Sequence, residues 1–156
     1  MTFLRFLMLL SLIVWLGGII FFVVLAPTLF SVLPTRHLAG SVVAPMLTKL
    51  HWMGIFSGAI FLISSMIYSR SANGVAQPFA VRHLLIYFML ALTLISQFGI
   101  SPKLAALRSS VGEIDSVAVT NPARVQFNAL HAWSTRLESG VLLLGLAVVY
   151  LTARRF

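Results

Sequence analysis

Four long, mostly apolar runs dominate this sequence and limit the folds open to it. They cover residues 6–26, 50–68, 84–100 and 132–152. A helix rises 1.5 Å per residue, so about 20 apolar residues cross a hydrocarbon core about 30 Å thick. With 60% hydrophobic and only 9% charged residues, the chain is unsuited to water as its main solvent. We therefore predict an integral membrane protein with four transmembrane segments.

The apolar runs are continuous rather than alternating, which favours helices over the strands of a membrane β-barrel. The predicted fold class is all-α, with a single four-helix transmembrane domain over residues 1–156. The first run is longer than the core of a signal peptide and has no convincing cleavage site, so we expect it to be retained. Because the chain has no cysteine, disulfides, thiolate metal sites and cysteine nucleophiles are excluded. The predicted helices cover residues 4–26, 36–69, 82–101 and 122–154.

Basic residues give the chain a net charge of +8, but they lie at helix ends and in loops rather than on one basic face. This distribution argues against nucleic acid and favours the headgroups of a lipid bilayer as the partner. Basic residues divide evenly between the two sides of the predicted membrane segment, although those on the side of the termini lie closest to helix ends. We expect a bacterial inner-membrane protein with both termini in the cytoplasm.

The two halves of the sequence carry the same markers in the same order. Each half has a proline where its first predicted helix ends, then a Leu-His pair, then a Ser-Gly pair. The prolines are Pro27 and Pro102, and the histidines are His51 and His131. This order predicts two tandem helical hairpins, related by a pseudo-two-fold axis along the membrane normal. Both histidines should then lie at a similar depth.

The second and fourth predicted helices begin well before their apolar runs. Thr35 is the expected N-cap of one helix, and Asn121 followed by Pro122 has the same role in the other. A helix over residues 122–154 would be about 50 Å long. Its first turns should therefore stand in the headgroup region.

Ionisable side chains within a membrane segment are costly and usually face a bundle interior or a water-filled cavity. Glu138 is the clearest case, because it follows His131 by nearly two helical turns and shares a helix face with it. Two imidazoles and this carboxylate could hold a divalent metal, and two imidazoles could ligate haem b. The expected metal or ion site comprises His51, His131 and Glu138, with supporting polar roles for His37, Gln97, Ser134 and Arg136.

These residues leave several functions open. The leading hypothesis is a non-enzymatic membrane protein that binds or conducts a metal ion or proton through this polar intramembrane face. A second is a haem-binding membrane oxidoreductase with His51 and His131 as axial ligands. A third is an accessory subunit of a homo-oligomer or larger membrane complex, in which small residues allow close helix packing. The polar side chains could also simply satisfy one another between helices. The expected packing residues are Gly17, Gly18, Gly54 and Gly58.

Several short motifs point to a known family. They are Trp15-Leu16-Gly17-Gly18, Leu33-Pro34-Thr35-Arg36-His37, His51 followed by Gly54 and Gly58, Ser101-Pro102-Lys103, and the aromatic-rich approach from Phe127 to His131. Together they resemble the transmembrane protein 205-like family, known in bacteria as domain of unknown function 4149, over nearly the whole chain. The resemblance implies a four-helix membrane domain whose histidines match His37, His51 and His131, and it implies no established reaction.

Two positions depart from that family's pattern. Ser101 stands where the family often has a carboxylate, and Ser139 stands where relatives often carry asparagine. A more distant likeness extends to copper-resistance membrane domains and to small haem-dependent protoporphyrinogen oxidases. The first predicted helix contains no histidine, which weakens the likeness to the oxidases.

Overall fold

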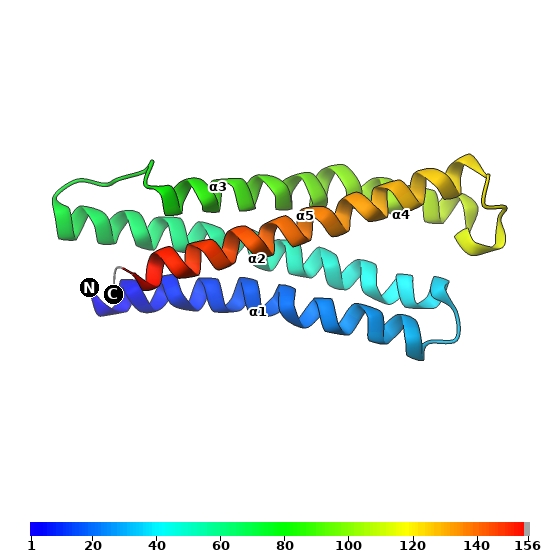
Figure 1. Cartoon of the computed structure of the whole chain (residues 1–156), viewed down its shortest axis with the longest axis horizontal. Coiled ribbons are helices and arrows are strands. Elements are labelled where there is room, and N and C mark those ends of the chain that lie inside the picture. The colour runs from blue at the N-terminus through cyan, green and yellow to red at the C-terminus, as the bar shows by residue number, and fades with distance from the viewer. Residues whose placement is uncertain (155–156) are drawn as a thin grey trace.

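The computed structural model describes residues 1–154 and is an elongated bundle of four helical spans (Figure 1). No strand occurs within this range. The four helical spans confirm the predicted all-α fold. All four are also long and apolar enough to cross a membrane. The elements are α1 (Thr2–Val32), α2 (Arg36–Asn73), α3 (Val81–Leu94), the π-helix η1 (Ile95–Ile100), α4 (Ser101–Val111), the 3-10 helix η2 (Ile114–Ser116) and α5 (Pro122–Ala153).

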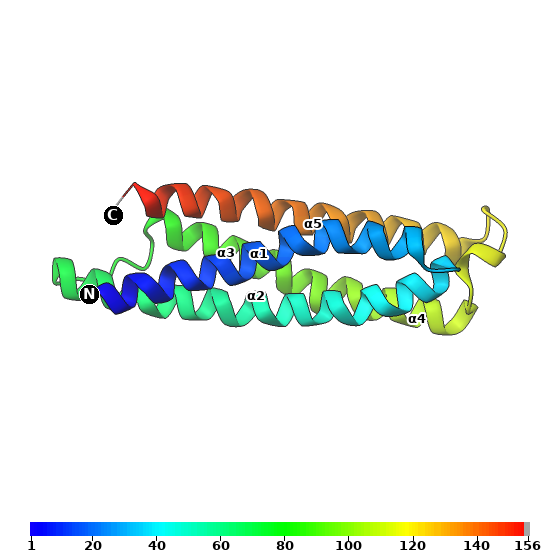
Figure 2. The same ribbon diagram turned by 90° about the horizontal axis from the view of Figure 1, so that it is seen from below.

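The helices form two hairpins that lie side by side. α1 packs chiefly against α2, and α5 packs chiefly against α3, which continues through η1 into α4. Neighbouring spans run in opposite directions, so α1 begins and α5 ends at the same end of the bundle (Figure 1). The view in Figure 2 shows that the spans stay together along the whole length. The arrangement of two hairpins agrees with the prediction from sequence.

Both expected N-caps are present. The Thr35 hydroxyl accepts a hydrogen bond from the backbone N–H of Leu38 at 3.1 Å, and α2 begins at the next residue. The Asn121 side chain accepts from the N–H of Ala123 at 2.9 Å, with Pro122 as the first residue of α5. These bonds satisfy N–H groups that have no partner within the helix.

The two prolines do not end their helices where the sequence pattern predicts. α1 continues past Pro27 to Val32, because a proline removes one hydrogen bond without stopping a helix that neighbouring groups support. Pro27 leaves only the carbonyl of Val23 without its helical donor, and the Thr28 hydroxyl donates to the next carbonyl, that of Val24, at 2.8 Å. In the second hairpin the chain passes Pro102 and remains helical to Val111. Both spans are therefore longer than the expected 4–26 and 82–101.

The core lies between α1, α2, α3 and α5, and glycines allow the close approach of α1 to its neighbours. A Cβ on Gly54 would lie 2.4 Å from Trp15 Nε1, and one on Gly58 would lie 2.9 Å from Cζ3 of the same ring. The indole of Trp15 is only 2% exposed. Gly145 of α5 similarly accommodates Leu16, since a Cβ there would lie 2.2 Å from Leu16 Cδ2. The tight helix contacts thus depend on the missing side chains.

Basic residues define two levels along the bundle. Lys49 and Arg70 of α2 are 21 positions apart, as are Arg82 and Lys103 of the third span. At 1.5 Å per residue both separations are about 31 Å, close to the thickness of a hydrocarbon core. We define the loop level by Lys49, Lys103 and Arg136, and the terminal level by Arg5, Arg70, Arg82 and Arg154.

Aromatic side chains accompany both levels. Trp52 and Trp133, which are 42% and 55% exposed, lie three positions from Lys49 and Arg136 of the loop level. Tyrosines 68 and 150 lie within four positions of basic residues of the terminal level. Aromatic residues of this kind favour the two membrane–water interfaces. On this placement, the 13 positions from Arg36 to Lys49 extend α2 about 20 Å beyond the loop level.

Candidate functional site

Three polar side chains from three different spans meet inside the bundle. His51 of α2 is 1% exposed, and its Nδ1 lies 2.7 Å from Oε1 of Gln97 in η1. Its Nε2 lies 2.7 Å from Oε1 of Glu138 in α5, whose side chain is 15% exposed. We call these three residues the buried triad. The triad joins the two hairpins through hydrogen bonds.

The tautomer of His51 sets the donor and acceptor roles in both contacts. Oε1 of Gln97 can only accept, so the Nδ1–H of His51 donates to it. The contact between His51 Nε2 and Glu138 Oε1 then holds one proton, carried either by an imidazolium or by a carboxylic acid. Both arrangements have zero net charge.

The π-helix η1 brings Gln97 into the triad. Pro102 has no N–H to donate to the carbonyl of Phe98, four residues earlier. Just before the proline, the N–H of Ser101 donates to the carbonyl of Ser96, five residues back. The wider turn inserts an extra residue into the helix, and π segments of this kind are frequent at functional sites. Sequence reasoning missed η1, although Pro102 was the available signal.

The triad lies just inside the loop level. His51 is two positions beyond Lys49, and Glu138 is two positions beyond Arg136. Two positions along a helix correspond to about 3 Å. The carboxylate is therefore close to the membrane boundary, yet it remains enclosed by the bundle.

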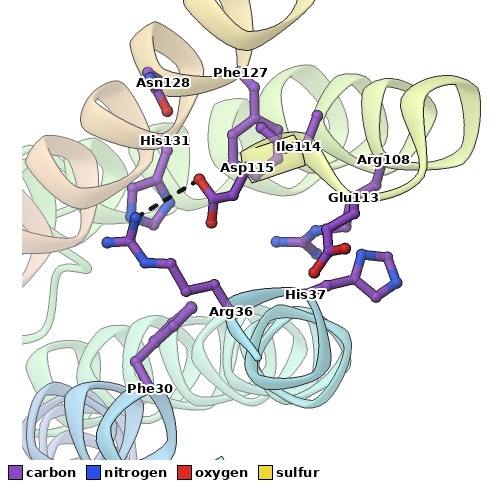
Figure 3. Close-up of a pocket in the computed structure, with 10 residues that line it drawn as sticks. All are labelled: Phe30, Arg36, His37, Arg108, Glu113, Ile114, Asp115, Phe127, Asn128 and His131. Carbon is purple, nitrogen blue, oxygen red and sulfur yellow. Dashed lines mark ion pairs between the residues drawn. The ribbon is translucent and has the colours of Figure 1, made fainter. Parts of the chain in front are cut away.

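A cavity of about 210 Å³ lies on the loop side of the triad (Figure 3). The charged and titratable residues around it come from α2, α4, the segment around η2, and α5. The guanidinium of Arg36 lies 3.7 Å from the carboxylate of Asp115, which also accepts from Arg124 at 3.4 Å. We call this space the loop cavity; its lining includes Arg36, His37, Arg108, Glu113, Asp115 and His131.

The structure brings Glu138 to His51 and not to His131. His131 lines the loop cavity, where its ring stacks on Phe127 with the centroids 6.4 Å apart. It precedes Glu138 by seven positions, about 10 Å along α5. Both ring nitrogens of His51 are engaged by the triad. The two imidazoles therefore do not form the facing pair that a shared metal or an axially ligated haem would need.

Ser134 lies between His131 and Glu138 on the same face of α5. It is 4% exposed and comes three positions after His131 and four before Glu138. Such spacings place side chains above one another on a helix. The expected polar face of α5 is thus present, and it leads from the loop cavity to the triad.

On the far side of the triad a hydrophobic cluster lies in the bundle interior together with buried polar side chains, among them Thr93 and the hydrogen-bonded pair of His83 and Ser65. Phe61, Ile86, Met89 and Val141 are each 0% exposed and belong to one hydrophobic cluster. No cluster of three or more His, Asp or Glu side chains within residues 1–154 is placed to hold a metal ion. Within the part of the chain that the structure describes, buried polar residues therefore lie on both sides of the triad, and the loop cavity adjoins it on one side.

Arg136 and the predicted packing glycines are not part of the triad. Arg136 turns away from the triad and lies over the ring of Trp133, with Cζ 5.3 Å from the centroid. A Cβ on Gly18 would lie 2.2 Å from Met53 Cε, so this glycine, like Gly54 and Gly58, packs within the chain. Gly17 faces open space, since a Cβ added there would meet no atom within 4 Å.

Arg108 is a structural residue that sequence reasoning did not single out. It donates to the carbonyl of Gly40 at 3.0 Å and lies over the ring of Phe127. A Cβ at Gly40 would lie 2.8 Å from Nη2 of this arginine. The pairing joins α4 to α2 and α5, and no local sequence signal indicates it.

A family description, domain of unknown function (DUF4149), matches residues 10–112, which is more than half of the chain. The match includes His51 and Gln97, whereas Glu138 and His131 lie beyond it. The resemblance to this domain is thereby confirmed, while the broader transmembrane protein 205-like grouping stays a prediction. Comparisons with curated proteins and with solved structures give no match.

Proposed function

The chain belongs to the DUF4149 family, and from the geometry of the triad we propose that it reversibly binds a proton or a small cation at Glu138. The observation that carries the proposal is the 2.7 Å contact between His51 and Glu138 inside a membrane-spanning bundle. A carboxylate in such a place needs a compensating positive charge. The shared proton supplies that charge.

Loss of the shared proton would leave an anionic carboxylate beside a neutral imidazole. This state costs free energy in a medium of low dielectric constant, because nothing balances the charge. A cation that takes the place of the proton restores neutrality. Proton and cation should therefore compete for Glu138, with Gln97 holding the imidazole in a fixed orientation from its other nitrogen.

The loop cavity supplies the route by which the proton or cation arrives. His131 lines this cavity, and Ser134 continues the polar face towards Glu138. Beyond the triad, the cluster around Phe61 and Met89 is apolar, and Ser57, Thr93 and His83 are buried polar residues on the same side. The proposal is therefore one of reversible binding from the loop cavity.

The proposal can be tested on the purified protein in lipid nanodiscs by infrared difference spectroscopy. Acidification should produce the carbonyl band of a protonated carboxylic acid, and Glu138→Gln should abolish the component that comes from the membrane interior. Glu113→Gln is the matched control, because Glu113 is an exposed acid in the segment before η2. That variant should keep the buried component.

A second measurement follows the competition. Salts of Na⁺, K⁺, Mg²⁺ and Zn²⁺ are added in turn to weakly buffered protein, and a pH-sensitive dye reports released protons. At least one cation should release protons from the wild type and from Glu113→Gln, but not from Glu138→Gln. Identical infrared and dye signals in Glu138→Gln and the wild type would refute the proposal and leave the triad as a helix contact.

A further inference from the structure

A second cavity, of about 310 Å³, lies at the opposite end of the bundle. The ends of α1, α2, α3 and α5 enclose it, at the end where the chain begins (Figure 1). Its lining includes Met8, Tyr68, Ser69, Asn73, Arg82 and Thr152. We call it the terminal cavity. The triad and the loop cavity share none of these residues.

Thr152 contributes to this cavity a buried hydroxyl group without a hydrogen-bond partner among the described residues. The residue is 2% exposed, and its Oγ1 makes no hydrogen bond with any residue from 1 to 154. Buried hydroxyl groups are nearly always hydrogen-bonded, and helical threonines often bond to a carbonyl one turn earlier. An oxygen-rich ligand in the cavity would satisfy this group.

The positive charge around the cavity favours an anionic ligand. Arg82 lines it and is 6% exposed, and Arg5 donates to the Tyr68 hydroxyl in its wall. The chain has three acidic residues. Two of them, Glu113 and Asp115, line the loop cavity at the far end, and the third belongs to the triad. The terminal end therefore combines arginines with no Asp or Glu side chain.

The depth of the cavity indicates where the anion comes from. Arg82 belongs to the terminal level, about 31 Å from the loop level, so it lies where phospholipid phosphates gather. Met8 adds an apolar wall, and Phe6, two positions away, is 55% exposed on the lipid-facing surface. An acyl chain beside Phe6 and a phosphate beside Arg82 would suit one amphipathic molecule.

We propose that the terminal cavity binds the phosphate headgroup of an anionic phospholipid, with Arg82 and Thr152 as its main polar contacts. Arginine is suited to phosphate because its planar guanidinium can donate two parallel hydrogen bonds. The Thr152 hydroxyl adds a third donor, and Asn73 can add a fourth.

Native mass spectrometry and thermal unfolding test this proposal. The protein is placed in nanodiscs of phosphatidylglycerol or of phosphatidylcholine, and the variants Thr152→Val and Arg82→Gln are compared with Arg70→Gln. Arg70 lies at the same level but outside the cavity lining, so its variant loses the same charge. Thr152→Val keeps the shape of the side chain. It therefore provides a second test of the site if Arg82→Gln fails to fold.

Phosphatidylglycerol should remain bound to the wild type and raise its unfolding temperature relative to phosphatidylcholine. Arg82→Gln should weaken retention roughly tenfold, equivalent to about 1.4 kcal/mol, Thr152→Val should weaken it several-fold, and Arg70→Gln should match the wild type. Equal losses in all three variants would overturn the site in favour of general surface attraction. Equal stabilisation of delipidated protein by inorganic phosphate would overturn the lipid assignment.

Discussion

His51 uses both ring nitrogens to hold two other helices, so its removal affects more than one contact. Replacing it with leucine leaves the Glu138 carboxylate buried without its partner, which should cost about 3 kcal/mol of unfolding free energy. Glu138→Leu leaves a ring nitrogen unsatisfied and should cost about 1–3 kcal/mol. The double variant should be more stable than the sum of these losses predicts, by about 1–3 kcal/mol.

Unfolding of the reconstituted protein in denaturant, followed by circular dichroism, measures these three free energies. The corresponding changes at His131 give a control, since this residue makes no hydrogen bond with Glu138 in the structure. His131→Leu combined with Glu138→Leu should be additive. Additive losses for the His51 pair as well would show that the 2.7 Å contact contributes no coupling energy.

The sequence predicts the polar residues of the site better than it predicts their pairing. Helical spacing alone places His131, Ser134 and Glu138 on one face of α5. Which histidine meets Glu138 depends on how two helices rotate against each other, and spacing within one helix carries no such information. The π turn before Pro102 adds a further shift that a regular 3.6-residue period misses. Hence the sequence identifies Glu138 but does not distinguish its partner His51 from its neighbour along α5.

At the scale of elements, the contact between α1 and α2 depends on glycines that leave room for Trp15. Gly54→Ala would place a Cβ 2.4 Å from the indole Nε1, and a ring that is 2% exposed has little freedom to move. Overpacking of this kind should cost about 1–3 kcal/mol of stability. Gly17→Ala, in the same helix pair, enters open space and should change stability by less than about 1 kcal/mol, towards greater stability.

Thermal unfolding of the two glycine variants in the same nanodiscs provides the comparison. A loss of stability in Gly17→Ala as large as that in Gly54→Ala would indicate that another molecule covers the outer face of α1. Gly17 and Gly54 look equivalent in the sequence, because each lies in a small-residue pattern. Only the packing of α2 onto one face of α1 separates them.

The sequence predicts helix ends well where a cap decides them and poorly where a proline does. Thr35 and Asn121 each accept a backbone N–H and start their helices as expected. The pattern around Pro27 predicts the end of α1, but the helix runs on to Val32. A cap is a local hydrogen bond that the sequence specifies, whereas the effect of a proline depends on whether nearby groups support the backbone.

At the scale of the whole molecule, the two cavities lie at opposite ends and differ in charge. The loop cavity is lined by arginines together with Glu113 and Asp115, while the terminal cavity is lined by Arg82 without an Asp or Glu side chain. The apolar part of the bundle lies between the loop level and the terminal level. The loop cavity should therefore face water and the terminal cavity should face lipid phosphates.

Cysteine labelling checks this placement, since the natural chain has no cysteine. Val125 and Leu143 of α5 are 54% and 68% exposed on the protein surface. Relative to Arg136, the first lies 11 positions outside the loop level, about 16 Å, and the second lies seven positions inside it, about 10 Å. Val125→Cys should react with a membrane-impermeant maleimide from one side of sealed vesicles, whereas Leu143→Cys should react only after the bilayer is dissolved. Exposure to solvent alone predicts faster labelling at position 143, so a reactive Leu143→Cys in intact vesicles would contradict the proposed membrane boundaries.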